Sequence, residues 1–196
     1  SPKVFEIKDS QSLKRIDWKR KIDELNLTDW KNNPITSDEL KVLDYIVKTF
    51  EDGKVIGSLL KVKRSDQYIP LRKKIIELKR LTITPIIEPE FIEYGIDRLV
   101  ELFVLAYYLS FKYDVMITNP PYIGISSLEP TCKKYAVDNY PNSKTDMFAM
   151  FMETDFVKKN GFTAMINQHQ WMFASSYIDL RNRIIHKLSV VNLIHL

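Results

Sequence analysis

The sequence is short of glycine, cysteine and long apolar runs, and each shortage excludes a class of protein. It has five glycines and one cysteine in 196 residues. A single cysteine cannot form an internal disulfide, which excludes the small disulfide-stapled domains and suits a reducing compartment. The longest apolar run, residues 102–111, is about half as long as a membrane-spanning helix requires. The first residues lack the charged-then-apolar pattern of a signal peptide, so we expect no membrane partner.

The composition is that of an ordinary globular protein with a mildly basic charge. Hydrophobic residues make up 45% of the chain and charged residues 28%. The 29 basic and 25 acidic side chains leave a formal net charge of +4. This balance is compatible with a nucleic-acid partner but does not by itself require one.

Residues 1–88 form a helical, charged region, which we interpret as an insertion or spacer. Apolar residues between positions 14 and 25 recur at helical spacing. Thr36 and Glu39 have the spacing of a capping box that opens a helix running to about Glu51.

A run of basic residues lies between positions 61 and 80. Such a run can contact phosphates, each contact adding salt-dependent affinity, or it can be the solvated face of a helix. We favour the solvated face. Its members are Lys61, Lys63, Arg64, Arg72, Lys73, Lys74, Lys79 and Arg80.

The pattern changes near residue 112, after a long apolar helix predicted over residues 90–110. From there strand and helix alternate, which predicts an α/β fold containing part of a doubly wound, Rossmann-like parallel sheet. The working site of such a sheet lies at the carboxyl ends of its strands. The predicted elements are a buried strand at 114–118, a helix at 145–159 closed by Asn160-Gly161, a strand at 162–167, a helix from Ser175 or Ser176 to about Lys187, and a strand at 190–196.

Asn119, Pro120, Pro121 and Tyr122 follow the first of these strands directly. The amide oxygen of Asn119 and the carbonyl oxygen of Pro120 are two acceptors on a loop stiffened by proline. Two fixed acceptors can hold both hydrogens of a planar amino group and stabilise it as it attacks an electrophile. The Tyr122 ring offers a flat face on which a base can stack. The four residues therefore predict a pocket for an aromatic or amide-like amine, and adenine fits best.

Residues 107–196 resemble the adenine-specific DNA methyltransferases that carry an Asn-Pro-Pro-Tyr motif. The resemblance rests on Asp-Val-Met-Ile-Thr-Asn-Pro-Pro-Tyr at 114–122, Gly124, the segment 139–151 and Gln-Trp-Met-Phe at 170–173. These segments are most similar to the methyltransferase subunit of bacteriophage-exclusion systems and to type II restriction-modification enzymes. The resemblance implies a bacterial cytoplasmic enzyme that acts on double-stranded DNA with a flipped adenine, together with partner proteins of a defence system.

The resemblance also implies roles for individual residues. The four motif residues become catalytic, and Asn119, Asp146 and Phe148 border the S-adenosylmethionine site. The loop after the second strand lies near the target DNA and holds the predicted DNA-binding residues Gln168, His169, Gln170 and Trp171. No metal is implied, and three scattered histidines with one cysteine make no metal site.

One feature of the family is missing from the sequence. These enzymes carry an acidic, glycine-rich loop that holds the methionine end of the cofactor, whereas Gly53 and Gly57 are isolated and follow no strand pattern. We therefore expect the chain to be a middle piece of a larger enzyme, with residues 89–196 as the C-terminal half of the catalytic domain. By itself it is expected to be inactive.

Two other functions fit the same residues. The first is a protein glutamine methyltransferase, because Asn-Pro-Pro-Tyr also serves methylation of a side-chain amide. An assay on DNA against a glutamine-bearing protein separates this alternative. The second is a non-catalytic DNA-binding or scaffolding module, which the basic run at 61–80 favours.

Overall fold

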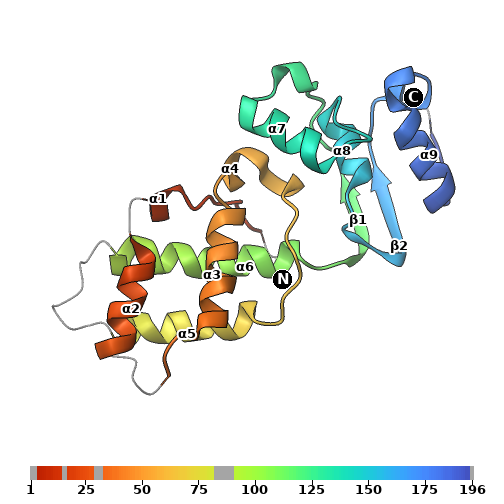
Figure 1. Ribbon diagram of the computed structural model, residues 1–196. Coiled ribbons are helices and arrows are strands. Elements are labelled where there is room, and N and C mark those ends of the chain that lie inside the picture. Colours follow the sequence, from red (N-terminus) through yellow and green to blue (C-terminus); the bar gives the residue numbers. More distant parts are fainter. Residues whose placement is uncertain (1–3, 15–16, 29–32, 82–90, 195–196) are drawn as a thin grey trace. The chain divides into compact units, whose positions relative to one another are not determined.

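The chain folds into two compact units, which we call unit 1 (Ser1–Phe111) and unit 2 (Lys112–Leu196). The computed structural model (Figure 1) describes residues 4–14, 17–28, 33–81 and 91–194. The units meet in sequence where the pattern changes to alternating strand and helix. The assignment of residues 89–196 to a catalytic domain stays a prediction.

Unit 1 is helical, as its sequence predicts. It consists of amphipathic helices whose apolar residues are buried together. Part of the helix predicted over 90–110 is a π-helical turn that leads into α6. The elements are α1 (Gln11–Lys14), α2 (Trp18–Thr28), α3 (Ser37–Thr49), α4 (Gly53–Ile56), the 3-10 turn η1 (Gly57–Leu59), α5 (Tyr68–Leu81), the π-helical turn η2 (Phe91–Ile96) and α6 (Asp97–Leu109).

The predicted capping box at the start of α3 is confirmed. The Thr36 hydroxyl accepts a hydrogen bond from the Glu39 backbone N–H at 3.3 Å, and the Glu39 carboxylate accepts one from the Thr36 N–H at 2.8 Å. Two orphan N–H groups of the first turn are satisfied in this way. The helix ends at Thr49, close to the predicted end.

The core of unit 1 lies between α3, α5 and α6. In Figure 1, α3 crosses α5 and α6, which run alongside each other. Tyr68 of α5 and Phe103 of α6 are fully buried, with ring centroids 6.2 Å apart. The Tyr68 hydroxyl donates to the Lys63 carbonyl, so this buried polar group is satisfied.

The basic run at 61–80 is only partly helical, because residues 61–67 precede α5. Several of its cations are used within unit 1. Lys74 pairs with Glu39 at 2.7 Å, and Lys79 pairs with Asp97 at 2.6 Å. The Arg64 guanidinium lies 4.5 Å from the centroid of the Phe111 ring. These contacts agree with a mainly structural role, and phosphate binding by the run stays a hypothesis.

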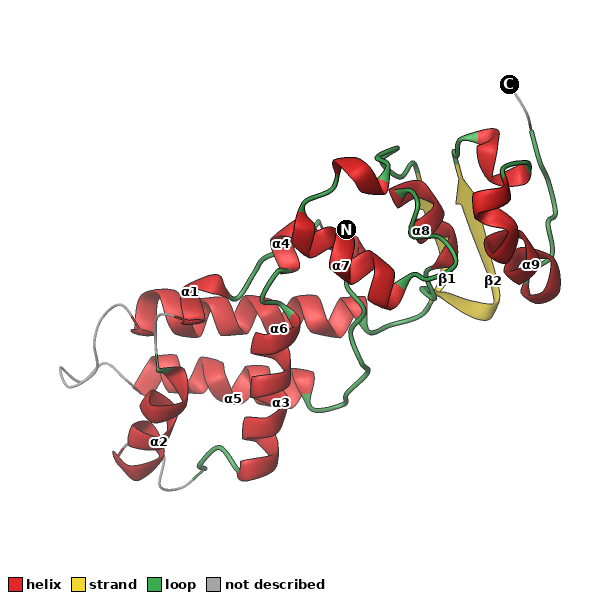
Figure 2. Ribbon diagram, turned by 45° about the horizontal axis from the view of Figure 1, so that its top comes forward, coloured by secondary structure: helices red, strands yellow, loops and turns green. Residues whose placement is uncertain are grey.

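Unit 2 is built on two parallel strands, β1 (Tyr113–Thr118) and β2 (Val157–Met165), and the molecule as a whole is a mostly helical α/β protein. Thr118 at the end of β1 pairs with Met165 at the end of β2. Figure 2 shows the strands side by side, with α8 next to β1 and α9 next to β2. The other elements are η3 (Ile125–Ser127), α7 (Pro130–Asn139), α8 (Met147–Glu153), η4 (His169–Met172), η5 (Ser175–Tyr177) and α9 (Ile178–Lys187).

The predicted helix at 145–159 is wrong in its second half. α8 ends at Glu153, and β2 begins at Val157 and contains Asn160-Gly161, the expected helix end. The pairing of the two strands is irregular here: Tyr113 pairs with Val157, but Val115 pairs with Phe162, so β2 has extra residues between these two pairs. A Cβ on Gly161 would lie 2.5 Å from the Asp114 carbonyl oxygen. Gly161 therefore permits a close approach of two strands at a bulge, and does not end a helix.

Three further expectations at unit 2 are corrected. Residues 190–194 form no strand, since they make no ladder with β1 or β2 in the described part of the chain. β1 is not a buried strand, because Val115 is 54% and Ile117 80% exposed on a two-stranded sheet. Neither Ser175 nor Ser176 caps α9, because these serines belong to the 3-10 turn η5 and the capping residue is Tyr177.

Candidate active site

The Asn-Pro-Pro-Tyr motif forms the turn that leaves the carboxyl end of β1. Asn119 is exposed, Pro120 is buried, and Tyr122 is 42% exposed. The Tyr122 hydroxyl lies 2.9 Å from Asn119 Oδ1 and 2.8 Å from the carbonyl oxygen of Ile166. A hydroxyl has one proton, so it donates to one of these acceptors at a time.

Residues at the end of β2 hold this turn in place. The Ile166 N–H donates to the Thr118 carbonyl at 3.2 Å, which extends the parallel ladder beyond β2. The Ile166 carbonyl faces the Tyr122 hydroxyl. The motif is therefore tied to the neighbouring strand by a backbone bond and by a side-chain bond. Sequence reasoning missed Ile166, because a backbone carbonyl leaves no signal in residue type.

The Tyr122 ring rests on the core of unit 2. It meets the Phe148 ring edge to face, with centroids 6.1 Å apart, and Phe148 in turn lies 5.8 Å from Tyr177. Phe148 has no exposed surface and packs in a cluster with residues of α8 and α9. Its contact with the proposed site is therefore through Tyr122. The members of this cluster are Phe148, Ala149, Tyr177, Leu180 and Ile184.

Asp146 joins the segment after the motif to α8. Its Oδ1 accepts a hydrogen bond from the Phe148 N–H at 3.1 Å and caps the helix. Asp146 also forms an antiparallel bridge with Gly124, and the Met147 N–H donates to the Ile123 carbonyl at 3.0 Å. Burial raises the pKa of Asp146 above its ordinary value of 3.8, against the opposing effect of nearby backbone N–H groups.

Substitution of Asp146 separates its capping role from its charge. We expect Asp146→Ala to lower the free energy of unfolding by about 1 kcal/mol, because the cap is lost. Asp146→Asn keeps an acceptor and should cost less. Because the folded-state pKa of Asp146 is raised, ionisation destabilises the folded state progressively as pH rises from 3.8 through the folded pKa. The advantage of asparagine should develop over this range. Urea unfolding at several pH values measures this, with the exposed Asp138→Ala as control.

The predicted DNA-binding residues lie on the loop after β2. Gln168 precedes η4, whose first two residues, His169 and Gln170, are exposed. Trp171 is partly buried and packs against the core cluster, as a loop-anchoring tryptophan would. The structure thus brings all four residues to the carboxyl end of β2, the same end of the sheet as Asn119.

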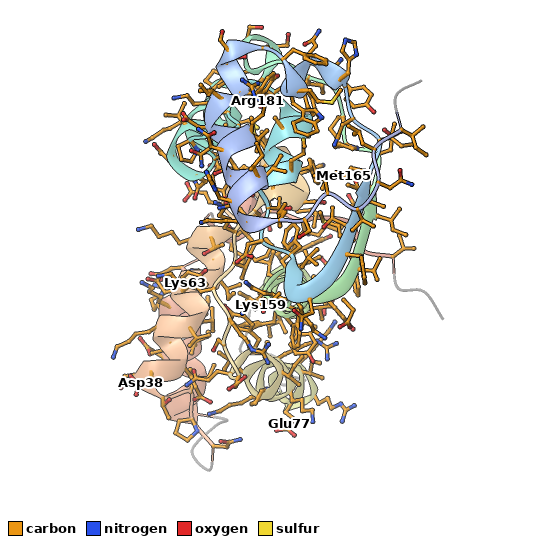
Figure 3. The ribbon with its side chains drawn as sticks, turned by 90° about the vertical axis from the view of Figure 1, so that its right-hand side faces the viewer. Asp38, Lys63, Glu77, Lys159, Met165 and Arg181 are labelled. Atoms are coloured by element: carbon orange, nitrogen blue, oxygen red, sulfur yellow. The ribbon has the colours of Figure 1, made fainter. Side chains whose placement is uncertain are left out.

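Arg181 of α9 is hydrogen-bonded to the backbone of this loop. Its Nη1 donates to the carbonyl oxygens of Trp171 at 2.9 Å and Ala174 at 2.6 Å. Figure 3 labels Arg181 on α9 and Met165 on β2, the strand that leads into the loop. Nothing in the sequence marks Arg181, because its partners are backbone atoms seven and ten residues away.

Two buried side-chain oxygens beside the motif have no hydrogen-bond partner within the described structure. They are Thr145 Oγ1, next to the Asp146 bridge, and Asn167 Oδ1, directly after Ile166. Buried polar atoms are nearly always satisfied in folded proteins. The Asn167 oxygen can only accept a hydrogen bond, whereas the Thr145 hydroxyl can donate or accept one.

Neither a metal centre nor a membrane span is found among the described residues. No cluster of three or more His, Cys, Asp or Glu side chains is placed to hold an ion in the described ranges. Within the same ranges, no helix has both the length and the apolarity to cross a bilayer.

The fold and this site define a class of protein: an α/β protein with hydrogen-bond acceptors and an exposed aromatic ring at the carboxyl end of parallel strands. Comparison with known proteins gives the particular family. Residues 61–196 match the family model described as Eco57I restriction-modification methylase. The chain therefore belongs to this family.

Two curated relatives are similar to the chain. It is 33% identical over 162 residues to the adenine-specific methyltransferase BrxX of Escherichia coli O9:H4 (strain HS), a match that covers 82% of the chain. It is 34% identical over 197 residues to the adenine-specific methyltransferase PglX of Lacticaseibacillus casei (strain Zhang), across 100% of the chain. The matches span only 13% and 15% of these relatives, so the chain corresponds to a fragment of them.

Proposed function

We propose that this chain is the base-holding part of an adenine-specific DNA methyltransferase of the restriction-modification or phage-exclusion type. The observation that carries the proposal is the Asn119–Tyr122 turn at the carboxyl end of β1, braced by Ile166, in a chain of a methylase family. Both named relatives are adenine-specific methyltransferases, which favours DNA over protein glutamine as the substrate.

The motif residues have distinct roles in this proposal. Asn119 Oδ1 and the Pro120 carbonyl oxygen accept hydrogen bonds from the two N–H groups of the adenine amine. As the nitrogen attacks, it gains positive charge, and fixed acceptor dipoles stabilise that charge without reorganising. The exposed Tyr122 ring stacks on the flipped base, and Pro121 stiffens the turn.

S-adenosylmethionine would supply an electrophilic methyl group to this amine. The residues around the motif fit only the border of a cofactor site. Asp146 is used as a helix cap, and Phe148 is buried in the core below Tyr122. No glycine-rich loop accompanies them in the sequence. Asn119 and Asp146 would border the cofactor site, and other parts of the full-length protein would hold most of the cofactor.

The loop with Gln168, His169, Gln170 and Trp171 would contact DNA beside the flipped adenine. Exposure of His169 and Gln170 and the anchoring of the loop by Arg181 support this role. The strand–helix–strand arrangement of unit 2 supports its assignment to a doubly wound sheet in the full-length enzyme. Such an enzyme would mark host DNA in the bacterial cytoplasm, alongside the partner proteins of a defence system.

The proposal is tested by incubating the full-length protein with S-adenosylmethionine and plasmid DNA. We expect N6-methyladenine in the DNA digest and no methylglutamine in a glutamine-bearing protein treated in parallel. The isolated chain should transfer no methyl group, because most of the cofactor site is missing. Methylated protein with unmethylated DNA would contradict the proposal, and so would binding of DNA with no methylation of either substrate.

A further inference from the structure

Asn167 occupies the position on β2 that corresponds to the motif on β1. Thr118 pairs with Met165, so Pro120 and Asn167 each come two residues after a paired position at the same end of the sheet. The residue that precedes Asn167, Ile166, binds Thr118 through its N–H and Tyr122 through its carbonyl. This backbone connection places Asn167 beside the turn that presents Asn119.

The Asn167 side chain differs from two other asparagines of unit 2 in its hydrogen bonding. Its Oδ1 is buried and has no partner among the described residues. Asn142, by contrast, donates from Nδ2 to the Glu153 carboxylate at 2.7 Å. Asn139 donates to the Tyr135 carbonyl at 3.0 Å. These two amides serve the fold, whereas the Asn167 acceptor contributes no hydrogen bond to it.

An unpaired buried acceptor makes folding less favourable, and an apolar residue of similar size would not carry that cost. Departures from complete hydrogen bonding are expected mainly at functional sites, where the group can be used in the bound state. The missing partner must be a donor, an N–H or O–H group. The group that the proposed function brings to this end of the sheet is the exocyclic amine of the target base, which carries two N–H bonds.

We propose that Asn167 is a further substrate-binding residue, whose Oδ1 accepts a hydrogen bond from the exocyclic amine held at Asn119. This inference rests on the proposed function. The amine has two N–H groups and would lie among three acceptors, Asn119 Oδ1, the Pro120 carbonyl and Asn167 Oδ1, so one N–H group is shared between two of them. The N–H groups leave the plane of the ring as the nitrogen becomes tetrahedral. A third acceptor placed out of that plane can then accept a hydrogen bond from them. Asn167 would thus bind more strongly as positive charge develops on nitrogen.

A stability measurement separates this role from a structural one. In the full-length protein, Asn167→Leu should leave the melting temperature unchanged or raise it, because a buried unpaired acceptor is replaced by an apolar group. Asn142→Leu is the matched control and should lower the melting temperature, because it leaves the Glu153 carboxylate with one bond fewer. A fall for Asn167→Leu as large as that for Asn142→Leu would show a structural role and overturn the inference.

A thermodynamic cycle tests the contact itself, by combining one substitution in the protein with one change in the substrate. The probes are two duplexes with the sequence that the full-length protein methylates, one with adenine and one with purine, which lacks the amine, at the target position. Binding is measured with S-adenosylhomocysteine present. We expect the wild type to bind the adenine duplex about tenfold more tightly than the purine duplex. For Asn167→Leu this ratio should fall at least about threefold, since one partner of the amine is gone.

An unchanged ratio in the variant would mean that Asn167 does not meet the amine, and would overturn the inference. The kinetic counterpart is a fall in kcat of about tenfold for Asn167→Leu, with KM for S-adenosylmethionine unchanged. These results are distinguishable from failure of the proposed function. In that case the wild-type protein would methylate no DNA, and no target sequence would be found with which to build the duplexes.

Discussion

Replacing Asn119 with alanine in the full-length protein is expected to reduce DNA methylation about 100- to 1000-fold, the range typical for loss of one preorganised hydrogen-bonding group. Asn119 lies at the carboxyl end of β1 with its side chain exposed, so it makes little contribution to the core. Its Oδ1 is the atom proposed to accept a hydrogen bond from the adenine amine. The loss should therefore appear in kcat, with the melting temperature nearly unchanged. Methyl transfer to the target duplex, measured under single-turnover conditions, gives the rate.

Asn192→Ala is the matched control for this variant, because Asn192 is an exposed asparagine of the same unit outside the motif. It should methylate at the wild-type rate. If Asn119→Ala also retains full activity, the motif does not hold the reacting amine and the catalytic proposal fails. Loss of activity together with a large fall in melting temperature would instead assign Asn119 to the fold, and would equally contradict its proposed role.

Phe148→Ala is expected to destabilise unit 2 strongly. The Phe148 side chain has no exposed surface and lies in the cluster that joins α8 to α9. Truncation of a buried phenylalanine typically costs about 3–5 kcal/mol, from lost burial and the cavity that remains. A domain has only about 5–15 kcal/mol of stability in total, so the loss is a large fraction of it.

Urea unfolding of the chain followed by circular dichroism measures this effect. Phe173→Ala provides the control, because Phe173 is 73% exposed and its truncation should change stability by less than about 1 kcal/mol. The Tyr122 ring packs edge to face on Phe148, so methylation by the full-length variant should fall as well. Equal stability of the two variants would show that the cluster is not the core of unit 2.

Local patterns in the sequence determined much of this molecule. The capping box at Thr36 and Glu39 and the strand before Asn119 were predicted because each depends on neighbouring residue types. The return of the chain in a parallel strand was predicted from the alternation of strand and helix. The motif at 119–122 and its surroundings indicated the methyltransferase family to which residues 61–196 belong. Short-range hydrogen bonding and burial periodicity are properties of a continuous segment, so they can be read without the fold.

Tertiary structure decided where β2 begins and how the site is completed. Residues 157–159 were expected to continue the preceding helix, but Val157 pairs with Tyr113 and the strand resumes its pairing at Phe162, after a bulge at which Gly161 closely approaches Asp114. The same dependence on a partner explains why residues 190–194 form no strand in the described part of the chain. The bond from Tyr122 to Ile166 joins residues 44 positions apart, and the bonds from Arg181 to the loop depend on how α9 packs. The Asn167 oxygen, which has no partner among the described residues, is likewise identified only by the fold. Such contacts depend on strand register and packing, which residue types alone do not specify.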